Sequence, residues 1–165
     1  MSDAIEKLLE MQSGGNPMDI KGLANGNVKI KMDKNLIIEK AREFIDTPYE
    51  HQGRLKGIGI DCCGLIICVA HELGISDYDI GQYDQWADGV DLIREFTSEC
   101  NPINDWEPGD ILVFTIGKIP RHCGIVGSKD GNVTLIHAYS TIGRCVEHNL
   151  DKVWLDRIFQ GFALK

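Results

Sequence analysis

The fold of this chain is decided by the stretch Ile60-Asp61-Cys62-Cys63-Gly64-Leu65. The residues that follow, up to Gly74, are mostly apolar at helical spacing, and an aspartate directly before such a run is a favourable N-cap. The pattern therefore predicts a helix over residues 62–73 that begins at a cysteine. A thiol in the first turn of a helix lies where backbone N–H groups and the helix dipole favour negative charge, so we expect the pKa of Cys62 to be lowered.

Two histidines, His122 and His137, lie far along the chain, each inside a run that is typical of a β-strand. Residues 129–132, Lys-Asp-Gly-Asn, predict a hairpin turn between the two runs, so the histidines should lie on neighbouring strands, close enough to share a hydrogen bond. A thiol hydrolase needs a thiolate, a histidine that carries a proton and a group that orients this histidine. A cysteine at the start of a helix with histidines on distant strands fits these roles, and the sequence predicts a cysteine peptidase.

The other cysteines and histidines are weaker candidates. Cys63 should point toward the core, about 100° around the helix axis from Cys62, so we do not expect these two thiols to hold one metal. The chain has no C-x-x-C pair, which argues against zinc-ribbon and thioredoxin-like sites. His71 lies too far along the helix to reach Cys62, and His148 is expected in a solvated turn. We therefore expect neither a metal nor an organic cofactor.

The composition limits the class of protein. A chain of 165 residues, 43% of them hydrophobic, suffices for one domain with a core. The formal net charge of -8 argues against binding to nucleic acid or to an anionic membrane, because both attract clustered Lys and Arg. The N-terminus shows no basic region followed by an apolar core, so we expect no signal peptide and synthesis in the cytoplasm.

The order of the predicted elements indicates an α+β domain. Helical patterns come first, over residues 35–45, 62–73 and 91–100. Strand-like runs follow, over residues 110–116, 122–127, 133–139, 145–147 and 157–163. We expect the cysteine helix to pack on a C-terminal antiparallel sheet within a domain over residues 32–165. Residues 1–31 have too little apolar content to fold alone and are expected to be a linker, a docking arm or an upstream addition.

Six motifs in order carry a resemblance to a known family. They are Thr47-Pro48-Tyr49, a glycine-containing loop, Asp61-Cys62-Cys63-Gly64-Leu65, Glu107-Pro108-Gly109-Asp110, His122-Cys123-Gly124-Ile125-Val126 and Ile136-His137-Ala138. In order and spacing they resemble the NlpC-type family of cell-wall peptidases, and the resemblance implies a papain-like fold. Residues 49–52, Tyr-Glu-His-Gln, and the closing segment 154–162 further resemble the branch found in phage tails and gene-transfer agents. One departure is Cys63, where many relatives have serine.

The resemblance implies a role for each matching residue. Cys62 would attack the peptide carbonyl, and His122 would act first as base and then as acid. His137 would orient His122 as the third member of a Cys-His-His set, and Tyr49 would stabilise the oxyanion together with the Cys62 backbone N–H. Relatives usually cut the bond between D-glutamate and a diamino acid, so the implied partner is a stem peptide of peptidoglycan.

Further residues are candidates for substrate binding. His51 and Asp61 lie close to the predicted nucleophile in sequence, and Arg121 directly precedes His122. Arg121 and Arg54 could meet substrate carboxylates, although ordinary surface charge is the simpler interpretation.

Several functions are compatible with these features. The leading hypothesis is a peptidoglycan endopeptidase of a phage or prophage tail, incorporated in the virion through tail proteins. A non-catalytic tail protein that keeps the fold is the second. A thiol acyltransferase, lipid hydrolase or amidase on a related scaffold is the third, but permuted members of that wider group place histidine before cysteine, whereas Cys62 precedes His122 here. A host wall-remodelling enzyme would need an export signal.

Overall fold

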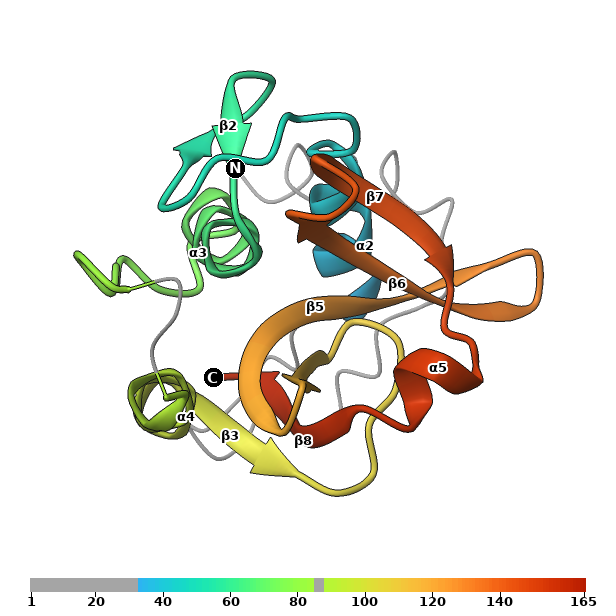
Figure 1. Cartoon of the computed structure of the whole chain (residues 1–165). Helices are drawn as coiled ribbons and strands as arrows, with labels where there is room; N and C mark the ends of the chain where they lie inside the picture. The colour runs from blue at the N-terminus through green and yellow to red at the C-terminus, as the bar shows by residue number, and fades with distance from the viewer. Residues whose placement is uncertain (1–32, 85–87) are drawn as a thin grey trace, which may run out of the picture. The chain divides into compact units, whose positions relative to one another are not determined.

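The computed structural model describes residues 33–84 and 88–165. These residues form a six-stranded sheet, a two-stranded ribbon and the helices that pack around them (Figure 1). The helices are α2 (Lys34–Arg42), α3 (Cys62–Glu72), α4 (Val90–Glu99) and α5 (Lys152–Leu155). The strands are β1 (Arg54–Leu55), β2 (Gly59–Ile60), β3 (Cys100–Ile103), β4 (Ile111–Ile116), β5 (Ile119–Lys129), β6 (Asn132–Tyr139), β7 (Arg144–Asn149) and β8 (Ile158–Leu164). The predicted α+β class, with the cysteine helix ahead of an antiparallel sheet, is confirmed.

The larger sheet is antiparallel throughout, in the order β3-β8-β4-β5-β6-β7. The turn predicted at residues 129–132 joins β5 to β6, and Asp130 and Gly131 both have positive φ, as a tight hairpin turn requires. Strand β5 begins at Ile119, earlier than the predicted start at residue 122, because the chain already turns at Gly117, whose φ is 71°.

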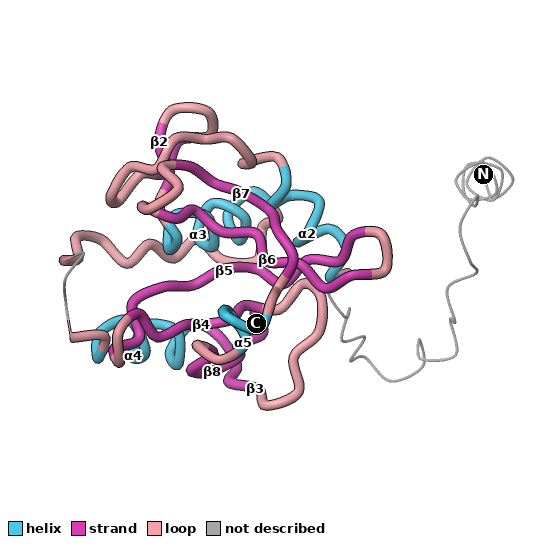
Figure 2. The backbone as a smooth tube through the Cα atoms, turned by 45° about the vertical axis from the view of Figure 1, so that its right-hand side comes forward, coloured by secondary structure: helices cyan, strands magenta, loops and turns pink. Residues whose placement is uncertain are grey.

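Helices α2 and α3 lie together on one side of β5 and β6 (Figure 2). Successive residues of a strand point to opposite faces, and Val113, Ile125 and Ile136 belong to the core on this side, together with Leu65 and Val69 of α3. A second core contains the alternate residues of the same strands: Leu112, Phe114, Val126 and Leu135, with Leu150 and Trp154. The sheet is therefore buried on both faces in its centre.

The sheet opens between β5 and β6. The pairing of these strands ends at Ile125 and Ile136, and beyond this point β5 stays with β4 while β6 stays with β7 (Figure 1). Gly124 lies where the strands begin to part, and a Cβ there would come within 3.0 Å of both the Ile136 carbonyl oxygen and the His137 Cβ. The opening places His122 and His137 just past the last backbone pair, so that their rings can meet.

The start of α3 is fixed from two sides. Asp61 is the N-cap, as predicted, and its carboxylate accepts the Gly64 N–H at 2.7 Å. The Gly53 carbonyl oxygen lies so near the helix that a Cβ at Gly64 would come within 2.1 Å of it. The loop before β1 therefore lies directly against the first turn of α3, which sets the direction of Cys62.

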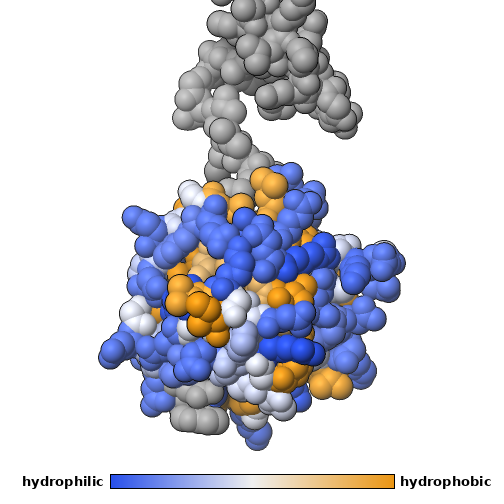
Figure 3. Space-filling model, turned by 90° about the horizontal axis from the view of Figure 1, so that it is seen from above, coloured by the Kyte–Doolittle hydropathy of each residue, from blue (hydrophilic) through white to orange (hydrophobic). Residues whose placement is uncertain are grey.

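One face of the described domain is mainly polar. Figure 3 shows a mostly hydrophilic face with apolar residues gathered in small patches. None of the described helices combines the length and the apolar composition that a bilayer span needs. The segment predicted to be an arm or linker, residues 1–31, lies outside the described residues.

Candidate active site

Cys62 lies at the wall of a cleft of about 900 Å³, measured with its open mouth. The cleft is bounded by the loop before β1, by the segment of residues 80–84, by the start of α4 and by β5. Tyr49, His51, Asp61 and Arg121 line it together with Cys62. The structure therefore brings these sequence-predicted residues to one cavity, of a size that proteins use for small ligands and peptides.

The environment of Cys62 favours a thiolate. Hydrogen bonds from the thiols of Cys123 and Cys63, followed by the interaction with His122, hold the pKa of Cys62 well below its ordinary value, although burial opposes the shift. The same contacts, together with burial, raise the pKa of Cys123 well above the ordinary value, and the pKa of Cys63 is raised beside the Cys62 thiolate. Cys62 is therefore the thiol of this group that ionises first, as the sequence predicts for the residue at the helix start.

Three histidine rings form a continuous chain of hydrogen bonds behind Cys62. His122 Nε2 lies 2.6 Å from His137 Nδ1, and His137 Nε2 lies 2.8 Å from His148 Nε2. His148 Nδ1 in turn lies 2.8 Å from the carbonyl oxygen of Asn149. The contact expected between His122 and His137 is present, but the chain continues further than the sequence indicated.

The carbonyl at the end of this chain fixes the proton on every ring. A carbonyl oxygen only accepts, so His148 must carry its proton on Nδ1 and, when neutral, accept on Nε2. His137 then donates from Nε2 and accepts on Nδ1, and His122 donates from Nε2. This assignment, inferred from the hydrogen-bond pattern, leaves Nδ1 of His122 as its basic nitrogen, able to exchange a proton with Cys62.

His137 is held neutral within the chain. Burial, with the positive charge that His122 and His148 can carry, lowers the pKa of His137 to about 2. A neutral ring can accept from one neighbour and donate to the other, which is what the assigned proton order requires. Aromatic rings enclose the chain: Tyr139 stacks on His137 with ring centres 5.5 Å apart, and Trp154 meets His137 edge-on at 4.8 Å.

The expectation that His148 lies in a solvated turn is wrong. The strand β7 continues to Asn149, past the predicted end at residue 147, because it stays paired with β6 as far as Thr134. This register places His148 beside His137. The missed signal is the alternation along residues 145–149, in which Val146 and His148 share the face opposite to Cys145.

Asp61 joins the nucleophile helix to the far wall of the cleft. Besides capping Gly64, its carboxylate accepts the Gln52 N–H at 2.7 Å and the hydroxyl of Tyr83, and Arg54 Nη1 lies 3.4 Å away. Burial and the nearby Cys62 thiolate raise the pKa of Asp61, while the hydrogen bonds oppose that rise. The carboxylate is thus occupied by groups of its own chain rather than presented to a ligand.

His51 and Arg54 also serve this network. His51 Nε2 lies 3.0 Å from the carbonyl oxygen of Tyr83, and Arg54 pairs with Asp79 at 3.1 Å. Both contacts hold residues 79–83 against the loop before β1. Arg121 lies on β5 at the cleft wall, directly before His122. Tyr49 lines the same cleft from a segment that pairs with Ile60.

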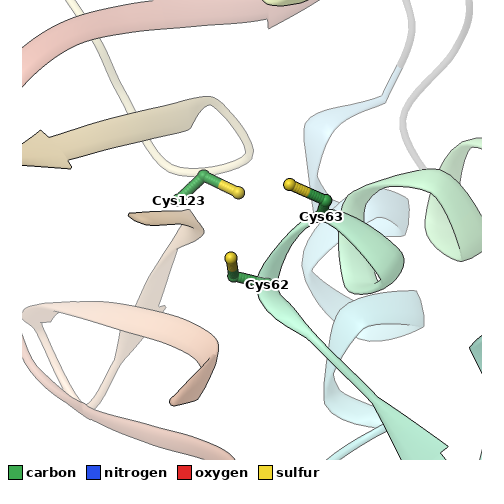
Figure 4. Close-up of side chains that lie close together, drawn as sticks. All are labelled: Cys62, Cys63 and Cys123. Carbon is green, nitrogen blue, oxygen red and sulfur yellow. The ribbon is translucent and has the colours of Figure 1, made fainter. Parts of the chain in front are cut away.

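Cys63 is buried in the core, as predicted, yet its thiol stays close to that of Cys62. Their Sγ atoms and that of Cys123 all lie within 4.8 Å of one another, and Figure 4 shows the three side chains pointing toward a common centre. Cys123, on β5, places its sulfur atom close to those of both Cys62 and Cys63. We did not expect Cys62 and Cys63 to hold one metal, but the three sulfur atoms lie at distances that would permit a shared ligand.

Comparisons with known proteins agree with this architecture. A family model described as the NlpC/P60 family matches residues 46–162. No curated protein sequence matches the chain. Among solved structures, the NlpC/p60 domain of the peptidoglycan hydrolase SagA is 20% identical with a TM-score of 0.55, over 81% of this chain and 100% of that one.

Two further structures share the fold. An N-acetylmuramoyl-L-alanine amidase from Bacteroides uniformis is 15% identical with a TM-score of 0.56, over 80% of this chain and 98% of that one. A lipoprotein-like protein of the NLP/P60 family from Staphylococcus aureus is 19% identical with a TM-score of 0.59, over 85% of this chain and 45% of that one. The match thus covers nearly all of the first two solved chains and under half of the third.

Proposed function

The chain belongs to the NlpC/P60 family, and from this premise we propose that it is a cysteine endopeptidase that hydrolyses the stem peptides of peptidoglycan. The observation that carries the proposal is the continuous line from the Cys62 thiol through His122 and His137 to His148. Such a line supplies a thiolate, a proton carrier and a fixed orientation for that carrier, which are the requirements of acyl transfer by a thiol.

In the proposed mechanism, the Cys62 thiolate attacks the carbonyl carbon of the scissile peptide bond while His122 carries the proton on Nδ1. The oxyanion that forms is stabilised by the backbone N–H of Cys62, which has no partner within its helix, and by Tyr49 across the cleft. His122 then gives its proton to the leaving amine as the C–N bond breaks. A thioester to Cys62 remains.

The second half of the cycle uses the same groups. His122 takes a proton from a water molecule, the hydroxide attacks the thioester, and the C–S bond breaks to release the Cys62 thiolate and a carboxylic acid, which loses its proton to solvent. His137 keeps the His122 ring in place throughout but transfers no proton to substrate. We therefore call Cys62 and His122 catalytic and His137 a positioning residue.

We further propose that the bond cut is the one between D-glutamate and a diamino acid. The cleft carries groups of both signs: Arg121 and Arg94 could bind the carboxylates of a stem peptide, and Asp91 and Glu95 could bind an amine. Arg94 already pairs with Asp91 at 2.7 Å, so a peptide that brings both charges could exchange with this pair. The Bacteroides relative that is described as an amidase makes the lactyl–alanine bond the alternative cleavage point.

Digestion of purified peptidoglycan, with products identified by mass spectrometry, tests the proposal. Endopeptidase activity releases peptides that begin with the diamino acid, whereas amidase activity releases peptides that begin with L-alanine. Cys62→Ala should abolish release, and Cys68→Ala, which removes a half-buried thiol from the same helix but outside the cleft, should not. An intact product profile after Cys62→Ala would disprove the mechanism, and inactivity of the wild-type protein on all wall types would favour a structural role.

The place of action is a separate proposal. We propose that the protein is carried by a phage tail, with peptidoglycan as substrate and tail proteins as partners, on the resemblance of residues 49–52 and 154–162 to that branch. The N-terminal segment is the proposed attachment. Particles assembled with a chain lacking residues 1–31 should lose the protein, and retention of the shortened chain would exclude that segment as the attachment.

A further inference from the structure

The Sγ atoms of Cys62, Cys63 and Cys123 lie within 4.8 Å of one another (Figure 4). Cys62 and Cys63 line the cleft, and Cys123 is fully buried beside them. We infer that these three thiols form a binding site for a thiophilic divalent cation, Zn²⁺ above all, and that the bound ion holds the protein in an inactive state.

The spacing of the sulfur atoms suits such an ion. Zinc binds thiolate at about 2.3 Å in tetrahedral geometry, which places bound sulfur atoms about 3.8 Å apart. The sulfur atoms of this cluster, all within 4.8 Å, need to move inward by at most about 1 Å. Rotation of the side chains on an otherwise fixed helix and strand suffices for a movement of this size.

The cluster draws its ligands from two packed elements. Cys62 and Cys63 stand in the first turn of α3, and Cys123 stands on β5, which packs against α3 in the main core. Cys63 and Cys123 are buried, so two ligands are held without competition from water, while half-buried Cys62 opens to the cleft and gives an ion a way in.

The chemistry of the ligands selects the kind of ion. Thiolates bind zinc, copper(I) and cadmium far better than magnesium or calcium, which prefer oxygen. The thiols already interact with one another, since Cys63 and Cys123 both donate hydrogen bonds to the Cys62 sulfur. An ion at the centre would replace these donated protons with a shared positive charge.

Inactivation follows from the identity of one ligand. Coordination occupies the electron pair with which Cys62 would attack a carbonyl carbon, so a chain that holds the ion cannot form the thioester. This consequence rests on the proposed function, whereas binding of the ion rests on the thiol geometry alone. The two can therefore fail independently.

Binding is tested on the full chain under reducing conditions, which keep the thiols from pairing as disulfides. Titration with Cd²⁺, followed through its thiolate charge-transfer absorbance, and Zn²⁺ competition against a chromophoric chelator give affinity, and native mass spectrometry gives stoichiometry. We expect one ion per chain. Cys123→Ala removes a direct ligand, so it should weaken binding by at least about 100-fold. This is the largest effect usual for removing a residue that only orients a ligand.

A matched control separates the cluster from thiols in general. Cys145 is as fully buried as Cys123 but lies outside the cluster, so Cys145→Ala should leave the affinity unchanged. Cys63→Ser should weaken binding as Cys123→Ala does, and melting curves establish that each variant is folded. Absence of a bound ion, or equal affinities of the Cys123→Ala and Cys145→Ala proteins, would overturn the proposal.

Peptidoglycan digestion with and without Zn²⁺ completes the test. Wild-type activity should be lost at the zinc concentration that saturates the site and restored by chelator. Each rate is compared with that of the same variant without Zn²⁺, because Cys123 also lowers the pKa of Cys62, and Cys123→Ala should keep its own zinc-free rate at that concentration. A protein that binds one ion at the three thiols yet never digests peptidoglycan refutes the proposed function and leaves the site standing. A protein that digests peptidoglycan and binds no ion refutes the metal site and leaves the proposed function standing.

Discussion

Replacement of His148 by leucine should disconnect the histidine chain from the carbonyl group that sets its proton order. In the wild-type protein His148 donates to the Asn149 carbonyl and accepts from His137. Leucine fills similar space but can do neither. His137 then loses the acceptor that keeps its proton on Nε2, and His122 loses the acceptor that keeps its own Nδ1 free for Cys62.

The size of the effect follows from one hydrogen bond in a buried place. A neutral hydrogen bond contributes about 0.5–1.5 kcal/mol, and a buried donor left without a partner costs about 1–3 kcal/mol. If the cost of about 1–3 kcal/mol falls on the tautomer in which His122 Nδ1 is free to take a proton, the rate falls by about 5- to 150-fold, since 1.36 kcal/mol corresponds to tenfold. The loss should appear in kcat rather than KM, because His148 is not among the residues that line the cleft.

Two assays read this change. Steady-state digestion of a defined stem peptide gives kcat and KM, and nitrogen NMR of isotope-labelled histidine shows which ring nitrogen of His122 carries the proton. His148→Gln is the conservative partner, because its amide oxygen can accept from His137 and should recover part of the rate. His71→Leu, a change at an exposed histidine that bonds the Tyr78 carbonyl, is the neutral control.

The outcome that contradicts this reasoning is specific. If His148→Leu keeps the wild-type kcat and the His122 proton stays on Nε2, then a group other than His148 sets the tautomer. If kcat falls but the tautomer is unchanged, His148 acts through packing, and the proton order assigned from the Asn149 carbonyl has no part in the rate.

Three further predictions follow from the described contacts. Iodoacetamide should label Cys62 at a pH well below about 8.5, the ordinary pKa of a thiol, and mass spectrometry at each pH gives the labelling rate. His122→Ala should shift this dependence of rate on pH upward. Identical dependences in the two proteins would mean that the two side chains are not coupled. Stability should fall as the pH drops below the ordinary histidine pKa of 6.5, because the unfolded chain takes up a proton that His137, with a pKa of about 2 in the fold, cannot bind. The loss should be about 2 kcal/mol at pH 5 in urea titrations, and a His137→Asn protein with an equally steep pH dependence would exclude His137 as its source. Gly64→Ala should lower Tm despite the better helix propensity of alanine, because its Cβ would come within 2.1 Å of the Gly53 oxygen; a raised Tm would show that the loop gives way.

The sequence was sufficient where the signals are local. The N-cap at Asp61, the turn at Asp130 and the alternation of the strand residues each act within a few positions, so the cysteine helix, the hairpin and the sheet could be predicted. The hairpin alone predicted that His122 and His137 lie near each other on neighbouring strands, whereas their direct contact also needs the strands to part after Ile125 and Ile136.

The rest of the site depends on packing between distant segments. His148 reaches His137 only through the register of β7 on β6, and a shift of one residue would turn it to the other face. Cys123 contacts Cys63 only because the first turn of α3 packs against the part of β5 that carries Cys123. Tyr83 comes from a loop without periodic pattern, and its hydrogen bond to Asp61 could not be read from the sequence.

The carboxylate of Asp61 has a consequence for engineering. It caps the nucleophile helix and at the same time fastens Tyr83, so the wall that would select the substrate and the residue that would cut it are joined by a single side chain. The segment around Tyr83 is consequently not an interchangeable module. A segment grafted here from a relative with another specificity would keep the helix cap intact only if it also placed a hydroxyl group beside Asp61. Mutant libraries that vary this wall of the cleft should therefore keep Tyr83 constant.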